Sequence, residues 1–247
     1  MNSDNVLAVA ISCGVFGLVI LIVLWPGDRQ GVRLLTKWGV PEPSPDQVSV
    51  AVRYLRRRRF WYPWLFIGIP LIPQLKSLPI MGGAGAVVIV ALLGGLIAEV
   101  VAQRPARQAR REAVLTTRRV LDFAPLWTFI VAGLAELGAV VRLAISGQWA
   151  ALGLVLVAAA VAWGMVLLAV RRPATGDAEV DMVLRTRSAR VAVGLTTGTA
   201  AMAGWIPSGK MQFPTFVAIL VTLAVFSAIA GPPPRKKKDR TTPAPAR

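Results

Sequence analysis

The sequence contains no histidine and only one cysteine, Cys13. Without an imidazole group the chain cannot build a bis-histidine haem site, a zinc peptidase motif with paired histidines, or a serine or cysteine hydrolase that uses a histidine base. A single thiol forms neither an intramolecular disulfide nor a thiol-rich metal site. We therefore expect no catalytic residue, no metal ion and no cofactor.

Charged residues are also scarce. They make up 16% of the 247 residues, whereas 55% are hydrophobic and the mean hydropathy is +0.60. This balance excludes a soluble globular domain and a disordered regulator. Basic residues outnumber acidic ones by 28 to 12, but a membrane explains that excess more simply than a nucleic acid does, so we expect no nucleic-acid partner.

Four long apolar blocks predict about seven transmembrane helices. A bilayer core of about 30 Å takes roughly 20 helical residues. Val6 to Trp25 is long enough for one span, and each of the blocks 60–101, 123–170 and 191–231 is long enough for two. Turn-forming residues near Pro73, Gly147 and Pro207 predict that these three blocks fold as hairpins. We expect an all-α, polytopic transmembrane helix bundle.

The basic residues predict its orientation. All but three of them lie between or after the apolar blocks, and the exceptions, Lys76, Arg142 and Lys210, lie near the hairpin tips. Cytoplasmic loops retain Lys and Arg, so we expect the N-terminus outside and the C-terminus in the cytoplasm. The expected parts are an outward anchor (1–25), a Pro-rich cytoplasmic segment with a basic amphipathic helix (26–59), a hairpin (60–101), a basic cytoplasmic helix (102–122), a hairpin (123–170), a cytoplasmic loop (171–190), a hairpin (191–231) and a disordered basic tail (232–247).

The first cytoplasmic segment carries a clear helix start. Ser44-Pro45-Asp46-Gln47 combines an N-cap, a proline at the first helical position and a capping-box glutamine. Val48, Val52 and Leu55 then recur on one face. This helix is expected to lie on the membrane surface or to dock a protein or lipid. The basic residues expected to contact anionic lipid or a partner are Arg56, Arg57, Arg58, Arg59, Arg118, Arg119, Lys236, Lys237 and Lys238.

Glu136 is the one acid expected at bilayer depth, because Glu99 and Asp122 lie at helix ends that water can reach. It serves either as a proton or cation relay, or as a neutral acid that hydrogen-bonds a neighbouring helix. Thr196, Thr197 and Thr199 offer further intramembrane hydroxyls, and the glycines around them, such as Gly204, predict close helix packing. Arg142 is expected to extend its side chain outward.

Two stretches carry a family resemblance. Tyr54-Leu55-Arg56-Arg57-Arg58-Arg59 precedes an aromatic span, and Ala113 to Asp122 precedes the next hairpin. In these stretches the chain resembles uncharacterised multi-pass integral membrane proteins of high-G+C Gram-positive bacteria. The resemblance implies a bacterial cell membrane and no particular activity.

Two functions remain open. The first is a non-enzymatic, structural or accessory component of a plasma-membrane complex, with the lipid bilayer and a membrane protein or a second copy as partners. The second is a small-solute or ion-coupled permease with Glu136 at its midplane. A lipid-modifying or lipid-binding enzyme would need a polar cluster at the interface, for which Arg118, Arg119 and Asp122 are the candidates. We expect no enzyme.

Overall fold

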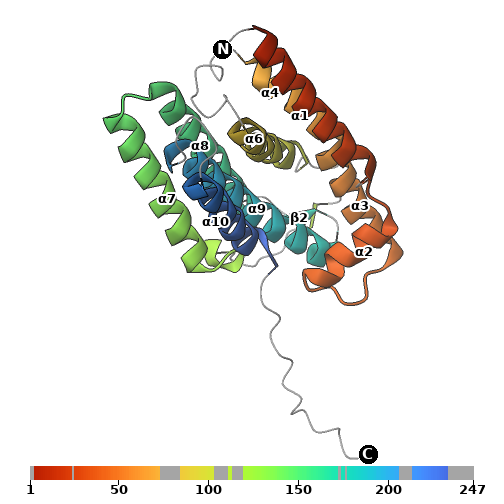
Figure 1. Cartoon of the computed structure of the whole chain (residues 1–247). Coiled ribbons are helices and arrows are strands. Elements are labelled where there is room, and N and C mark those ends of the chain that lie inside the picture. Colours follow the sequence, from red (N-terminus) through yellow and green to blue (C-terminus); the bar gives the residue numbers. More distant parts are fainter. Residues whose placement is uncertain are drawn as a thin grey trace, which may run out of the picture.

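The computed structural model describes residues 3–23, 25–72, 84–102, 111–112, 119–171, 174–175, 177–205 and 213–232. The described part is all-α except for one pair of very short strands (Figure 1). The helices are α1 (Ser3–Val23), α2 (Asp28–Lys37), α3 (Pro45–Phe60), α4 (Tyr62–Leu71), α6 (Ala84–Ala102), α7 (Leu126–Ile145), α8 (Trp149–Arg171), α9 (Ala178–Trp205) and α10 (Phe213–Ala230), with a 3-10 turn at Val120–Asp122.

The start of α3 confirms the capping box. The hydroxyl of Ser44 accepts a hydrogen bond from the backbone N–H of Gln47, and the Gln47 side chain accepts one from the backbone N–H of Ser44. The predicted apolar face of Val48, Val52 and Leu55 is buried. It packs against the chain itself, because Leu35 of α2 and Val180 of α9 lie in the same cluster as Val48 and Val52.

Helix α9 is the centre of the bundle. It packs against α6, α7, α8 and α10 (Figure 1), and it is buried almost continuously from Ser188 to Ala200. The expected close packing at its glycines is confirmed at Gly204, where an added Cβ would lie 2.6 Å from the Cβ of Ala139 on α7. The backbones of α7 and α9 can approach this closely only because position 204 has no side chain.

The segment expected to form a basic helix at 102–122 departs from that prediction where it is described. Arg111–Glu112 forms strand β1, which pairs antiparallel with β2 (Ala174–Thr175). Val120–Asp122 forms a 3-10 turn in which the Asp122 carboxylate accepts a hydrogen bond from the backbone N–H of Arg119. Strand pairing with 174–175 satisfies backbone groups that a helix would have satisfied internally.

Among the described residues, two helices are long and apolar enough to cross a membrane, α7 and α8. A third span results if α1 and α2 are counted as one element, although they meet at an angle of 91°. The described parts of α6 and α10 are apolar but shorter. Helix α4, within the block expected to hold the second span, has 10 residues and contains Pro70. The expected breaks near Pro73 and Pro207 lie outside the described residues, whereas Gly147 forms the predicted turn between α7 and α8 with a φ of +67°.

Candidate functional site

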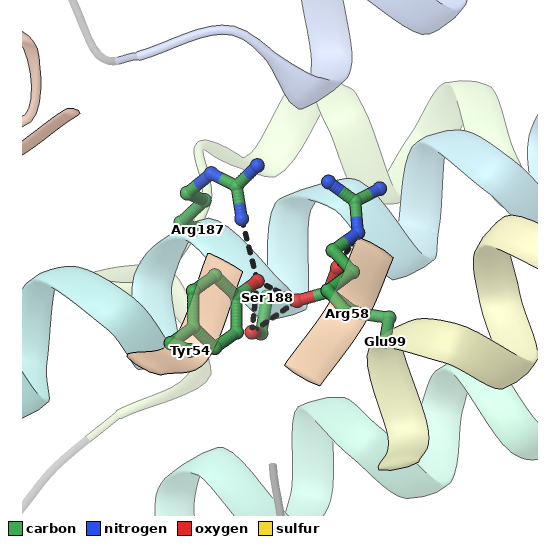
Figure 2. Close-up of polar contacts among 5 residues, drawn as sticks. All are labelled: Tyr54, Arg58, Glu99, Arg187 and Ser188. Atoms are coloured by element: carbon green, nitrogen blue, oxygen red, sulfur yellow. Dashed lines mark hydrogen bonds and ion pairs between the residues drawn. The ribbon is translucent and has the colours of Figure 1, made fainter. Parts of the chain in front are cut away.

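Helices α3, α6 and α9 bring five polar side chains together, with Glu99 at the centre (Figure 2). Tyr54 and Arg58 lie one helical turn apart on α3, so their side chains share a face. Arg187 and Ser188 are consecutive on α9, and Glu99 lies near the end of α6. The Glu99 side chain is fully buried, with an exposed fraction of 0%. We call this set, Tyr54, Arg58, Glu99, Arg187 and Ser188, the Glu99 cluster.

Each oxygen of the Glu99 carboxylate has its own partners. Oε1 accepts hydrogen bonds from the Tyr54 hydroxyl and from the Ser188 hydroxyl. Oε2 lies 2.7 Å from Nε of Arg58, in an ion pair whose atoms are not aligned for a hydrogen bond. A carboxylate taken out of water needs such partners, since an unpaired buried charge is strongly unfavourable.

Tyr54 connects the carboxylate to a second arginine. Its hydroxyl donates to Glu99 and accepts a hydrogen bond of 2.5 Å from Nη1 of Arg187. The Arg187 guanidinium also lies over the Tyr54 ring, 5.2 Å from its centroid. Burial raises the pKa of Tyr54 well above its ordinary value, so the phenol keeps the proton that it donates to Glu99.

The arginines outnumber the acid in this cluster. Burial by itself would lower the pKa of Arg58, but the neighbouring acidic groups of Tyr62 and Glu99 outweigh it and raise the pKa. Arg59, the next residue of α3, has a lowered pKa, first because of burial and then because of the positive charges of Arg58 and Arg187, against an opposing effect of Tyr62. One carboxylate is therefore paired directly with Arg58 and linked through Tyr54 to Arg187, and Arg59 adds a third guanidinium group beside them.

Burial of Glu99 corrects the expectation that water or headgroups reach it. The sequence places this acid near the end of an apolar block, and that position suggested exposure. In the folded chain the helix end is covered by α3 and by α9, whose residues lie 45 and 89 positions away in the sequence. Arg187 and Ser188 carried no recognisable motif, and only the excess of arginines on both sides of the block hinted at a partner for the acid.

Glu136 and Thr196, two of the predicted intramembrane polar residues, are brought together. Oε1 of Glu136 accepts a hydrogen bond of 3.0 Å from the Thr196 hydroxyl on α9, and Oε2 accepts one of 2.9 Å from Nε1 of Trp163 on α8. The carboxyl group thus joins three helices, α7, α8 and α9. Both of its donors are neutral groups, which suits a link between helices.

The two other threonines do not join this group. Thr197 donates to the backbone carbonyl of Val193 and Thr199 to that of Leu195, each one turn back on the same helix. Such bonds satisfy a hydroxyl inside an apolar helix without a partner from elsewhere. Arg142 is exposed, as expected of an outward side chain, and its guanidinium lies 5.4 Å from the ring centroid of Trp205.

The arginines expected to contact lipid or a partner fall into different surroundings. Arg56 and Arg57 are exposed, and Nε of Arg56 donates to the Pro26 carbonyl at 3.1 Å. Arg58 and Arg59 are partly buried, and Arg119 is exposed. Arg118, Lys236, Lys237 and Lys238 lie outside the described residues.

Within the described ranges, no three His, Cys, Asp or Glu residues lie close enough together to hold a metal ion. The chemistry that the Glu99 cluster offers is therefore charge pairing and hydrogen bonding by guanidinium groups. No family model, no curated protein and no solved structure matches the chain.

Proposed function

We propose that the chain is a multi-pass integral protein of the bacterial cell membrane, with seven spans, an outer N-terminus and a cytoplasmic C-terminus. We propose further that it is not an enzyme and serves as a structural or accessory component of a membrane complex. The lipid bilayer, a partner membrane protein or a second copy of the chain are its proposed contacts.

The observation that carries this proposal is the outward face of α7 and α8. Large apolar side chains on these two helices are exposed, among them Leu134, Leu137, Leu156, Val157 and Leu168. The inward faces carry small residues such as Ala132, Ala139 and Ala158, which are buried. A soluble protein rarely exposes so continuous an apolar surface, whereas lipid covers it without cost.

The single native cysteine makes the topology testable. In a Cys13→Ala background, one cysteine is introduced at Gln148, on the expected outer side, or at Arg53, on the expected cytoplasmic side; both positions are exposed. A membrane-impermeant maleimide is expected to label position 148 in intact cells and position 53 only after permeabilisation. The opposite pattern would reverse the proposed orientation, and labelling of both positions in intact cells would argue against a membrane barrier between them.

An accessory role is supported by the Glu136 carboxyl, whose two oxygens are both occupied by neighbouring helices, and by the exposed Arg56 and Arg57 of α3. The test is purification in mild detergent from the native membrane, followed by identification of proteins retained in near-equal amount. A companion is expected that is released by Arg56→Glu with Arg57→Glu and retained by Gln148→Glu on the other side. A chain that runs alone, or only with itself, would contradict the accessory role.

The second candidate is an ion-coupled or small-solute permease, favoured by the position of Glu136 in the middle of α7 with contacts to two neighbouring helices. Transport assays in vesicles with wild type and Glu136→Gln separate the candidates. A proton-coupled carrier loses transport in this variant, whereas an acid that only links helices tolerates the amide.

A further inference from the structure

Around Glu99, the positive charges of Arg58, Arg59 and Arg187 outnumber the one negative charge of the carboxylate. Arg58 uses Nε for its ion pair with Glu99, and Arg187 uses Nη1 for Tyr54. Among the described residues, the remaining N–H groups of these two side chains have no hydrogen-bond partner. Nη1 of Arg59 is buried and is likewise without a hydrogen-bond partner in the part of the chain that the structure describes.

The guanidinium groups of Arg58 and Arg187 lie on a common side of the cluster (Figure 2). Figure 2 shows the guanidinium groups of Arg58 and Arg187 on the same side of the row formed by Tyr54, Ser188 and Glu99. One phenol and one carboxylate separate the two groups, so they are held apart at a fixed spacing on two different helices. Arg59 follows Arg58 directly on α3 and adds a third guanidinium, whose Nη1 is buried without a hydrogen-bond partner among the described residues; the charges of Arg58 and Arg187 contribute to the lowered pKa of Arg59.

Such an arrangement favours the binding of an anion. Like charges held close together at partial burial are unfavourable, and a guanidinium fork is the side chain best matched to the oxygens of a phosphate. The neighbouring aromatic residues Trp61, Tyr62 and Trp64 mark the level at which lipid headgroups lie, if α3 borders the membrane as proposed. The negative charge of Glu99 is already balanced by Arg58, and its other oxygen accepts from Tyr54 and Ser188.

We infer that Arg58, Arg59 and Arg187 form a binding site for a phosphate group, above a floor made by Tyr54, Glu99 and Ser188. The phosphate belongs either to an anionic lipid headgroup or to a soluble phosphate. Placing the site at headgroup level rests on the proposed membrane topology, whereas the site itself rests on the three side chains and their surroundings.

The experiment compares two ligands and four proteins. Full-length protein is purified in neutral detergent, and binding of phosphatidylglycerol is measured by native mass spectrometry, with phosphatidylcholine as the uncharged reference. Binding of inorganic phosphate is measured in parallel by thermal shift. The proteins are wild type, Arg59→Gln, Arg187→Gln and the control Arg53→Gln, which removes the same charge from an exposed position of the same helix.

Saturable binding of one phosphate-bearing ligand is expected, weakened about tenfold or more by Arg59→Gln and by Arg187→Gln but less than about twofold by Arg53→Gln. Arg59 has no hydrogen-bond partner among the described residues to lose, so its variant is expected to fold even if Arg187→Gln does not. Loss with phosphatidylglycerol alone assigns the site to a lipid, and loss with inorganic phosphate assigns it to a soluble ligand. Equal effects of all three variants, or binding of neither ligand, would overturn the proposed phosphate site. The cysteine labelling described above tests the membrane topology separately.

Discussion

Gln47 and Asp177 join the first turns of two helices that lie 130 residues apart in the sequence. Nε2 of Gln47 donates a hydrogen bond of 2.8 Å to Oδ2 of Asp177, while Oε1 of the same amide accepts from the backbone N–H of Ser44. Asp177 in turn accepts, through Oδ1, from the backbone N–H groups of Glu179 and Val180 at the start of α9. One amide thus serves the capping of α3 and the anchoring of α9.

This link predicts an acid-sensitive contribution to stability. The hydrogen bond from Gln47, followed by that from the Val180 N–H, lowers the pKa of Asp177 below its ordinary value of 3.8. A carboxyl whose pKa is lowered by folding contributes its stability above its ordinary pKa and loses it as the pH falls through the lowered value. We expect Asp177→Asn to lower the Tm at pH 7 and to make the difference from wild type shrink toward pH 3.

The measurement is the Tm of both proteins in the same detergent between pH 7 and pH 3. Ser44→Ala, which removes the N-cap of α3, is the matched control, since it is expected to cost about 1 kcal/mol at both ends of the range. A difference between wild type and Asp177→Asn that stays constant with pH would contradict the assigned role of the carboxylate.

Glu99→Leu is expected to be among the most damaging single changes in the described part of the chain. It leaves Arg58 charged and partly buried without its acid, and it leaves the Tyr54 and Ser188 hydroxyls without their acceptor. Breaking a buried ion pair from one side costs about 3 to 5 kcal/mol. Chemical denaturation in detergent measures the loss, with the exposed Glu179→Gln as a control that changes stability by less than about 0.5 kcal/mol.

Two substitutions at Glu136 are expected to differ. Glutamine can accept from Nε1–H of Trp163 and donate to the Thr196 hydroxyl, so both links between helices persist. Leucine offers neither, so the buried Thr196 hydroxyl and the partly buried Trp163 indole lose their acceptor, at about 1 to 3 kcal/mol. We expect the Tm of Glu136→Gln to stay close to wild type and that of Glu136→Leu to fall; equal losses would argue that the charge itself is required.

Gly204 on α9 and Gly153 on α8 provide a matched pair of glycine-to-alanine substitutions. Gly204→Ala places a Cβ 2.6 Å from the Cβ of Ala139 and 2.9 Å from its Cα, so α7 and α9 must separate, at about 1 to 3 kcal/mol. Gly153 has nothing within 4 Å of an added Cβ, and Gly153→Ala is expected to stabilise α8 by about 0.5 to 1 kcal/mol. Thermal unfolding of the two variants side by side checks both signs.

The sequence predicted the features that depend on neighbours along the chain. The capping box of Ser44 and Gln47, the buried face of α3, the turn at Gly147 and the close approach at Gly204 each follow from a short pattern. The long apolar blocks also predicted the all-α class. The pattern that encodes each feature is local, even where the contact it permits is with another helix, as between Gly204 and Ala139.

What the sequence did not predict depends on which helices meet. Glu99 is buried because α3 and α9 close over the end of α6, and nothing near position 99 encodes that arrangement. The same holds for Trp163, whose indole reaches Glu136 from the next helix. Strand β1 at Arg111–Glu112 formed where a helix was expected, because its partner at 174–175 is supplied by a distant loop.

Helix α9 runs without interruption through the bundle. Its 28 residues form one helix that begins beside the cap of α3 at Ala178 and ends at Trp205, a rod of about 42 Å at 1.5 Å per residue. Over that length, a rigid tilt of about 5° at one end corresponds to a displacement of about 4 Å at the other. The arginines near the start of α9, its contact with Glu136 and its close approach to Ala139 at Gly204 all lie on this one rod.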